Sequence, residues 1–401
     1  RLFMAPTFLP AFLFALSGSE IAVGAARSVQ GLGAMASPTL GAALIGHRQR
    51  IKWIGIAAGL LARSQMLLVA LAVTVLPADA AVIATIACLG LMGWANGLGN
   101  VTLNVLRARV IPAHRRGLFL GLRNSLGGLA AAALAAWAGT RLLAGERAGD
   151  PDAYVGLFVL AFLVSATGLG ALALTREPEA VEVMPRRDLR GTVAAARALL
   201  RSEPAFATFF LAWGLGNVSR MGLPFYVLHA GERLEAAGAG LTGALLGALT
   251  TLWLLSGTCT RLVWGTLGDR HGHERVVVAG LGLWIAAQGL LIVASEPAGL
   301  MLAFVLLGVA SGGFHMGANS RVLELGTAAT TPLRLAAVTT VGHAVAAGAP
   351  LLGGLVGAAA GFPAVFALCM GAQAGALLLL IARAPTGATP LPSTTREETT
   401  P

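Results

Sequence analysis

Charged side chains are scarce in this sequence of 401 residues. Asp, Glu, Lys and Arg make up only 11% of the chain, while 56% of it is hydrophobic and the mean hydropathy is +0.77. Soluble domains carry about 25% charged residues, so this composition excludes an ordinary cytosolic or secreted enzyme. The sequence predicts an integral membrane protein.

Cysteine is nearly absent as well. Cys88, Cys259 and Cys369 lie far apart in apolar stretches and have no metal-ligand or redox spacing, so we expect neither a metal nor another cofactor. The formal net charge is +10, but a basic excess in a membrane protein indicates its cytoplasmic loops. The lipid bilayer is therefore an expected partner, and nucleic acid is not.

Long apolar runs dominate the sequence. A helix needs about 20 apolar residues to cross the roughly 30 Å of hydrocarbon in a bilayer. The runs that reach this length cover 20–46, 53–76, 80–108, 118–144, 153–175, 204–229, 239–264, 276–294, 298–323, 335–360 and 362–383. A shorter apolar segment at 2–17 precedes them. Because the chain starts at Arg1 rather than at a methionine, we expect this first helix to be truncated.

Basic residues alternate between the connections. Of the 28 Lys and Arg, 20 fall in every second connection, namely 47–52, 107–116, 176–201, 261–275, Arg321 with Arg334, and the segment from 383 onward. The opposite connections hold only Arg141, Arg147 and Arg233. The positive-inside rule places the richer side in the cytoplasm. Both termini then face the cytoplasm, which requires an even number of crossings and predicts twelve.

The longest connection divides the spans six and six. We expect an N-terminal half over 1–175, a cytoplasmic linker at 176–203 with a short surface helix, a C-terminal half over 204–383, and a disordered tail at 384–401. The predicted fold class is an all-α integral membrane bundle.

A motif stands between the eighth and ninth spans. It reads Gly265-Thr-Leu267-Gly268-Asp269-Arg270-His-Gly272-His-Glu-Arg275 and resembles the G-x-L-[AG]-D-R-x-G-x-x-[RK] signature of the major facilitator superfamily (MFS) of transporters. A degenerate copy lies at 41–52, and 107–117 is similar to another turn of that superfamily. The resemblance implies a twelve-helix fold of two pseudosymmetric six-helix halves, which is the kind of duplication that transporter folds show.

The resemblance also implies a role for the motif. In the superfamily its acid helps to hold the two halves together on the cytoplasmic side. The predicted gating residues within it are Gly265, Asp269, Arg270, Gly272 and Arg275. By pseudosymmetry, the partner of Asp269 is expected at the start of the fifth span, near Arg116 and Arg123. The alternative is that Asp269 is an ordinary solvated charge.

Polar residues within the spans are candidates for a substrate cavity, because such residues are costly in a bilayer. They fall on the fourth, seventh and tenth spans, which line the central cavity in the superfamily. The predicted cavity residues are Asn96, Asn100, Asn104, Trp213, Asn217, Arg220, Ser311, His315 and Asn319. Hydrogen bonding between helices is the alternative for the asparagines, and a structural histidine is the alternative for His315.

We therefore predict a secondary active transporter, not an enzyme, that moves a small organic solute by alternating access. Arg220 and the lack of any Asp or Glu deep in a span favour an anionic or neutral polar substrate. Coupling to protons is left open. The expected state is a multi-pass monomer in the cytoplasmic (inner) membrane. A multidrug or proton-type efflux transporter, a membrane-embedded transferase and a non-transporting sensor stay open as alternatives.

Overall fold

The computed structural model describes residues 7–45, 50–110, 113–144, 149–175, 177, 189–325 and 330–382. Within these residues the chain is helical and contains no strand. The predicted all-α class is confirmed. The tail at 384–401 and the linker residues 178–188 lie outside the described residues.

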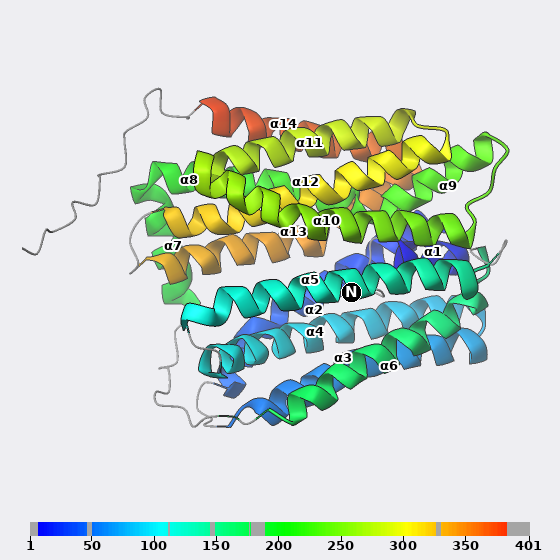
Figure 1. The fold of residues 1–401 in the computed structure, drawn as a ribbon, viewed down its shortest axis with the longest axis horizontal. Coiled ribbons are helices and arrows are strands. Elements are labelled where there is room, and N and C mark those ends of the chain that lie inside the picture. Colours follow the sequence, from blue (N-terminus) through cyan, green and yellow to red (C-terminus); the bar gives the residue numbers. More distant parts are fainter. Residues whose placement is uncertain are drawn as a thin grey trace, which may run out of the picture.

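The helices run nearly side by side along one axis (Figure 1). Those before the linker are α1 (Phe8–Ser17), α2 (Glu20–Ile45), α3 (Lys52–Val75), α4 (Ala78–Val110), α5 (Ala113–Arg141) and α6 (Tyr154–Ala173), the last preceded by the 3₁₀ turn η2 (Pro151–Ala153). The linker carries α7 (Leu189–Ser202). After it come α8 (Pro204–Asn217), η3 (Val218–Met221), η4 (Leu223–Phe225), α9 (Tyr226–Ala236), α10 (Gly243–His271), α11 (His273–Val293), α12 (Pro297–Glu324), α13 (Thr331–Ala360) and α14 (Phe362–Ala382).

Eight of the described helices are long and apolar enough to cross a membrane, and each corresponds to a predicted span. Helix α1 has only 10 residues and ends at Gly18, whose φ of 60° closes it. We call the end of the bundle where α10 and α12 finish the arginine-rich end, because the Arg-bearing connections gather there. The other end is the arginine-poor end.

The predicted span at 204–229 is not one continuous helix. Helix α8 stops at Asn217, two short 3₁₀ turns follow, and α9 starts at Tyr226. Pro224 has no N–H to donate to the preceding turn, and Gly222 adds backbone freedom. The break places Arg220 on irregular backbone in the middle of the bundle.

Charged residues join neighbouring helices at the arginine-rich end of the first half. Glu177 accepts hydrogen bonds from the backbone N–H groups of Ile51 and Lys52, at 2.8 and 2.9 Å, and so caps the start of α3. Arg63 donates from α3 to the Ser165 carbonyl of α6 over 2.8 Å. Pairing with a neighbour therefore explains this arginine within a span.

The two halves touch along α2 and α13. Pro350 lies inside α13, so the Ala346 carbonyl loses its usual donor one turn earlier. A Cβ added at Gly31 of α2 would lie 2.5 Å from that carbonyl oxygen. The Leu351 N–H donates to Ser28 Oγ of α2 over 2.9 Å. Only a glycine at position 31 lets the two backbones come this close.

A second contact between the halves joins α5 and α10. Thr251 of α10 donates to the Ala132 carbonyl of α5 over 3.0 Å, and a Cβ at Gly139 would lie 2.5 Å from the Gly243 carbonyl oxygen. Thr250 of α10 also bonds the hydroxyl of Thr7, just before α1, at 2.6 Å.

Both inter-half contacts lie toward the arginine-poor end. The α5–α10 contact reaches the middle of both helices, where a Cβ at Gly128 would overlap the Thr258 side chain. Nearer the other end, Leu122 of α5 is 53% exposed and Val263 of α10 is 54% exposed. The close contacts between the halves thus extend from the arginine-poor end to the middle of the bundle.

Adding a single methyl group at Gly31 tests this packing. Gly31→Ala is expected to lower the free energy of unfolding by about 1–3 kcal/mol, because the Cβ overpacks the α2–α13 contact. Gly289→Ala is the matched control, since a Cβ there meets nothing within 4 Å. Thermal unfolding in detergent compares the two variants. Equal stability of both would contradict the close contact.

Candidate functional site

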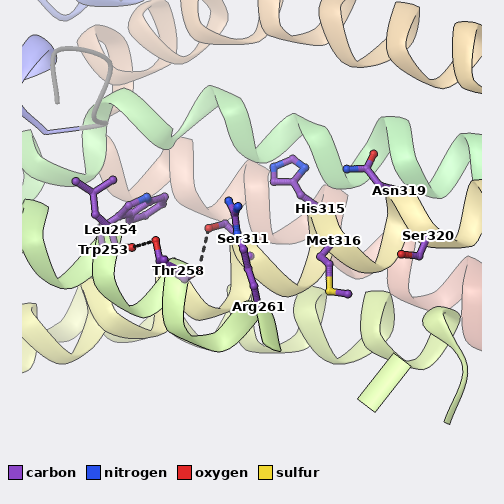
Figure 2. Close-up of a pocket in the computed structure, with 12 residues that line it drawn as sticks. Trp253, Leu254, Thr258, Arg261, Ser311, His315, Met316, Asn319 and Ser320 are labelled. Carbon is purple, nitrogen blue, oxygen red and sulfur yellow. Dashed lines mark hydrogen bonds between the residues drawn. The ribbon is translucent and has the colours of Figure 1, made fainter. Parts of the chain in front are cut away.

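A pocket of about 450 Å³ lies against α10 and α12, a size typical of small-molecule sites. It is lined by Trp253, Leu254, Gly257, Thr258, Arg261, Gly308, Ser311, Gly312, His315, Met316, Asn319 and Ser320. Figure 2 shows the two rows of side chains, with Arg261 rising from α10 toward Ser311 and His315 of α12. The predicted cavity residues Ser311, His315 and Asn319 thus share one pocket.

Arg261 is a pocket residue that the sequence analysis missed. Its charge was counted with the connection at 261–275, yet α10 continues to His271, ten residues further. Arg261 therefore lies about 15 Å along the helix from that end. The sequence does contain a signal for the longer helix. No pair of turn residues follows Arg261 until Gly272, whose φ of 89° ends the helix.

His315 is backed by aromatic rings. Its ring lies 5.7 Å from that of Trp213, 5.2 Å from that of Phe314 and 6.1 Å from that of Trp284, measured between centroids. Trp213 stacks on Phe314 and donates its indole N–H to the Val338 carbonyl over 3.0 Å. This wall holds the imidazole in place at the edge of the pocket.

Arg220 is joined to the same aromatic wall through Asn217. The Arg220 Nε donates to Asn217 Oδ1 over 3.1 Å, and Asn217 in turn donates to the Trp213 carbonyl over 2.8 Å. Asn217 therefore positions the guanidinium within the broken helix. Arg220 forms no ion pair within the described part of the chain.

The three asparagines of α4 do not line this pocket. Asn100 and Asn104 are exposed and Asn96 is half-buried. Asn100 lies nine residues after Leu91, an exposed apolar residue of the same helix, which places the two about half a turn apart. The asparagine stripe thus faces away from the exposed apolar side of α4 and toward the interior of the bundle.

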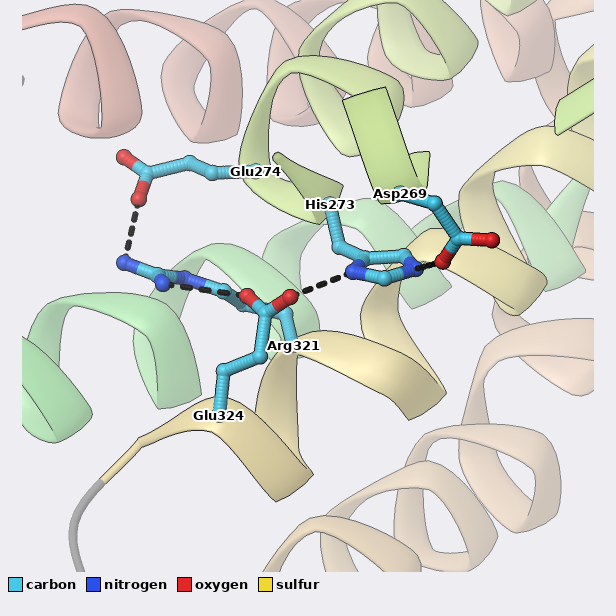
Figure 3. A network of polar contacts seen from close by, with 5 residues as sticks. All are labelled: Asp269, His273, Glu274, Arg321 and Glu324. Carbon is cyan, nitrogen blue, oxygen red and sulfur yellow. Dashed lines mark hydrogen bonds and ion pairs between the residues drawn. The ribbon is translucent and has the colours of Figure 1, made fainter. Parts of the chain in front are cut away.

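A polar network surrounds the predicted gating motif (Figure 3). His273 lies 3.8 Å from Asp269 and donates through Nδ1 to Glu324. Arg321 pairs with Glu274 at 2.5 Å and with Glu324 at 3.2 Å. The network joins the end of α10, the start of α11 and the end of α12, all within the second half.

The other predicted gating residues are placed as follows. The Asp269 side chain is 79% exposed and its ion-pair contact within the described residues is His273. Arg270 and Arg275 are exposed and Gly265 is half-buried. Arg123 is exposed and donates to Asn124 over 3.0 Å. The side chain of Arg116 lies outside the described residues.

Arg334 is a second arginine that the sequence analysis assigned to a connection between helices, whereas it lies in α13. It is fully buried near the start of α13 and pairs with both carboxylate oxygens of Glu203 at 2.6 and 2.7 Å. It also donates to the Leu325 carbonyl and lies over the Phe206 ring. This pair joins α8, α12 and α13 at the arginine-rich end and has a structural role.

Comparisons with known proteins bear on the second half of the bundle first. A family model described as Major Facilitator Superfamily matches residues 235–401. This part of the chain is therefore similar to that superfamily. The long apolar helices agree with a multi-pass membrane protein. No curated protein sequence matches the chain.

Solved structures of two transporters share the fold over nearly the whole chain. The crystal structure of the nucleoside transporter NupG superposes with a TM-score of 0.69 at 14% identity and covers 94% of this chain and 93% of that one. The crystal structure of the human organic anion transporter MFSD10 (TETRAN) has a TM-score of 0.60 at 18% identity, with 90% and 83% covered. At these identities the likeness shows the fold.

The exposure of Asn100 generates a labelling prediction. In a variant with Cys88, Cys259 and Cys369 replaced, Asn100→Cys is expected to react readily with a polar maleimide in detergent, because the side chain faces an open interior. Ala95→Cys on the same helix is the control, since Ala95 is fully buried. We expect at least about a tenfold difference in rate. Equal rates at the two positions would show that the stripe is packed.

Proposed function

We propose that this protein is a secondary transporter of the major facilitator superfamily that moves a small organic solute carrying an anionic group, by alternating access. The observation that carries the proposal is Arg261 beside Ser311 and His315 in an open pocket, with Arg220 held by Asn217 next to the aromatic wall of that pocket. Guanidinium groups in an apolar bundle are costly unless they meet an anion. None of the residues lining the pocket is acidic, so the substrate supplies the negative charge.

The packing of the halves supports alternating access. Close backbone contacts between α2 and α13 and between α5 and α10 seal the arginine-poor end. The pocket begins next to these contacts and extends toward the arginine-rich end. Rocking of the halves about the fixed site would open one end as the other closes. By the positive-inside rule the arginine-rich end faces the cytoplasm, so the proposal assigns the mouth of the pocket to the cytoplasmic side.

The names of the structural neighbours agree with a small polar or anionic substrate. One is a nucleoside transporter and another an organic anion transporter. Between these two, the arginines beside the pocket favour the organic anion, because a nucleoside carries no charge that would compensate them.

Transport by an Arg220 variant tests the proposal. In proteoliposomes, Arg220→Gln is expected to reduce uptake of labelled organic anions at least about tenfold, because a positive charge that attracts the anion toward the pocket is lost. Arg141→Gln is the matched control, since Arg141 is exposed at the last turn of α5. Saturable anion uptake that depends on Arg220 and not on Arg141 supports the assignment.

Two results would overturn it. Uptake of uncharged nucleosides in preference to every organic anion would contradict an anionic substrate. Transport that is identical in Arg220→Gln and the unmodified protein would remove Arg220 from the site.

A further inference from the structure

The pocket between α10 and α12 has an apolar end and a charged end. From this polarity we infer that it takes an amphiphilic organic monoanion, whose apolar ring lies deepest, against Trp253, and whose single carboxylate or sulfonate is held by Arg261. This inference rests on the proposed function and specifies the substrate class and its orientation.

Polarity rises along both helices from the deep end to the mouth. On α10 the lining begins with Trp253 and Leu254 and reaches its only charged residue at Arg261. On α12 it begins with buried Gly308 and ends with exposed Asn319 and half-buried Ser320. The deep end lies beside the sealed part of the α5–α10 contact, and the mouth faces the arginine-rich end. A ligand entering from the mouth therefore meets the apolar part last.

The deep end is closed by helix contact beside an aromatic ring. A Cβ at Gly257 would lie 3.1 Å from the Gly308 carbonyl oxygen, and one at Gly312 would lie 3.3 Å from the Gly257 carbonyl oxygen. The backbones of α10 and α12 thus nearly touch and close the pocket at this end. Trp253 lines the pocket next to this contact, and its ring lies 6.4 Å from that of Phe304 between centroids. An aromatic ring is the group that packs best against an indole.

The anionic group is assigned to Arg261 because the nearby hydroxyls are already used as donors. Thr258 donates to the Leu254 carbonyl over 2.6 Å and Ser311 donates to the Gly308 carbonyl over 3.1 Å. Their oxygens remain free only as hydrogen-bond acceptors, and an anion, which is itself an acceptor, needs donors. The Arg261 guanidinium is the one charged donor among the lining residues. One guanidinium matches one carboxylate in a bidentate pair.

The distance between the two ends limits the length of the ligand. Trp253 and Arg261 are eight residues apart on α10, which corresponds to about 12 Å along the axis. Helical side chains lean toward the preceding turn, so the guanidinium lies nearer to Trp253 than its Cα does. A ring joined to a carboxylate by a short chain spans this gap, whereas a short aliphatic acid reaches only one end.

Three matched probes separate the two ends of the site. These are 4-phenylbutyrate, butyrate without the ring, and 4-phenylbutanamide without the charge. With the full chain in proteoliposomes, competition against 4-phenylbutyrate uptake is expected to be at least about tenfold weaker for each of the other two probes.

Variants assign each preference to a residue. Arg261→Gln is expected to abolish the preference for acid over amide, while Arg261→Lys keeps it in part. Trp253→Leu is expected to abolish the preference for 4-phenylbutyrate over butyrate and to leave the preference for acid. Arg141→Gln and Trp137→Leu are the controls, because both residues are exposed on α5. Thermal unfolding of each variant establishes that it is folded.

The outcomes distinguish the inference from the proposed function. If organic anions are carried but Arg261→Gln and Trp253→Leu leave both preferences unchanged, the inference is wrong and the transport function stands. If Arg261→Gln and Trp253→Leu each reduce both preferences equally, the assigned orientation is wrong. If no organic anion competes or is carried, the proposed function fails together with the inference.

Discussion

Close backbone contact between the two halves is the constraint on which the rest of the structure depends. Without a hydrophobic force between helices in lipid, association requires van der Waals contact and interhelical hydrogen bonds. Gly31 meets the carbonyl that Pro350 leaves without a donor, and Ser28 accepts the next N–H of α13. These contacts extend from the arginine-poor end to the middle of the bundle, where Gly128 of α5 meets Thr258 of α10, a residue that lines the pocket.

Arginine serves two different purposes in this chain. Arg334 is fully buried and its charge is balanced by Glu203, so it joins three helices and is closed to a ligand. Arg261 lines a pocket that has no acidic residue, and Arg220 is positioned by the neutral amide of Asn217. A buried ion pair stabilises a fixed arrangement, whereas a guanidinium without an acidic partner is suited to a ligand that comes and goes. This contrast underlies the proposed anionic substrate.

Apolar length and motif spacing predicted most of the fold. Runs such as 276–294 and 362–383 became α11 and α14 with nearly the predicted bounds, because few other structures bury so long an apolar run. The interruption after Asn217 was not predicted, since Gly222 and Pro224 stand in a segment that is long and apolar enough on average to be assigned as one span. Hydropathy averages over such a window and does not register a local break.

The candidate site was only partly predictable. Polar spacing on one helix predicted that Ser311, His315 and Asn319 share a face, and they line one pocket. The same reasoning counted Arg261 and Arg334 as loop charges, because sequence alone does not show that α10 runs on to His271 or that Glu203 approaches Arg334. Contacts between helices that are distant in sequence depend on how the helices pack. The order of polar and apolar residues along the chain does not specify these contacts.

The most direct test of the account measures the separation of α5 and α10 at the arginine-rich end. Spin labels at positions 122 and 263, both exposed, are introduced after Cys88, Cys259 and Cys369 are replaced, and their distance is measured by pulsed electron paramagnetic resonance with and without 4-phenylbutyrate. The account predicts a long distance in the free protein and a population with a shorter distance when the anion is bound. A single unchanged distance under saturating anion would contradict alternating access around this site.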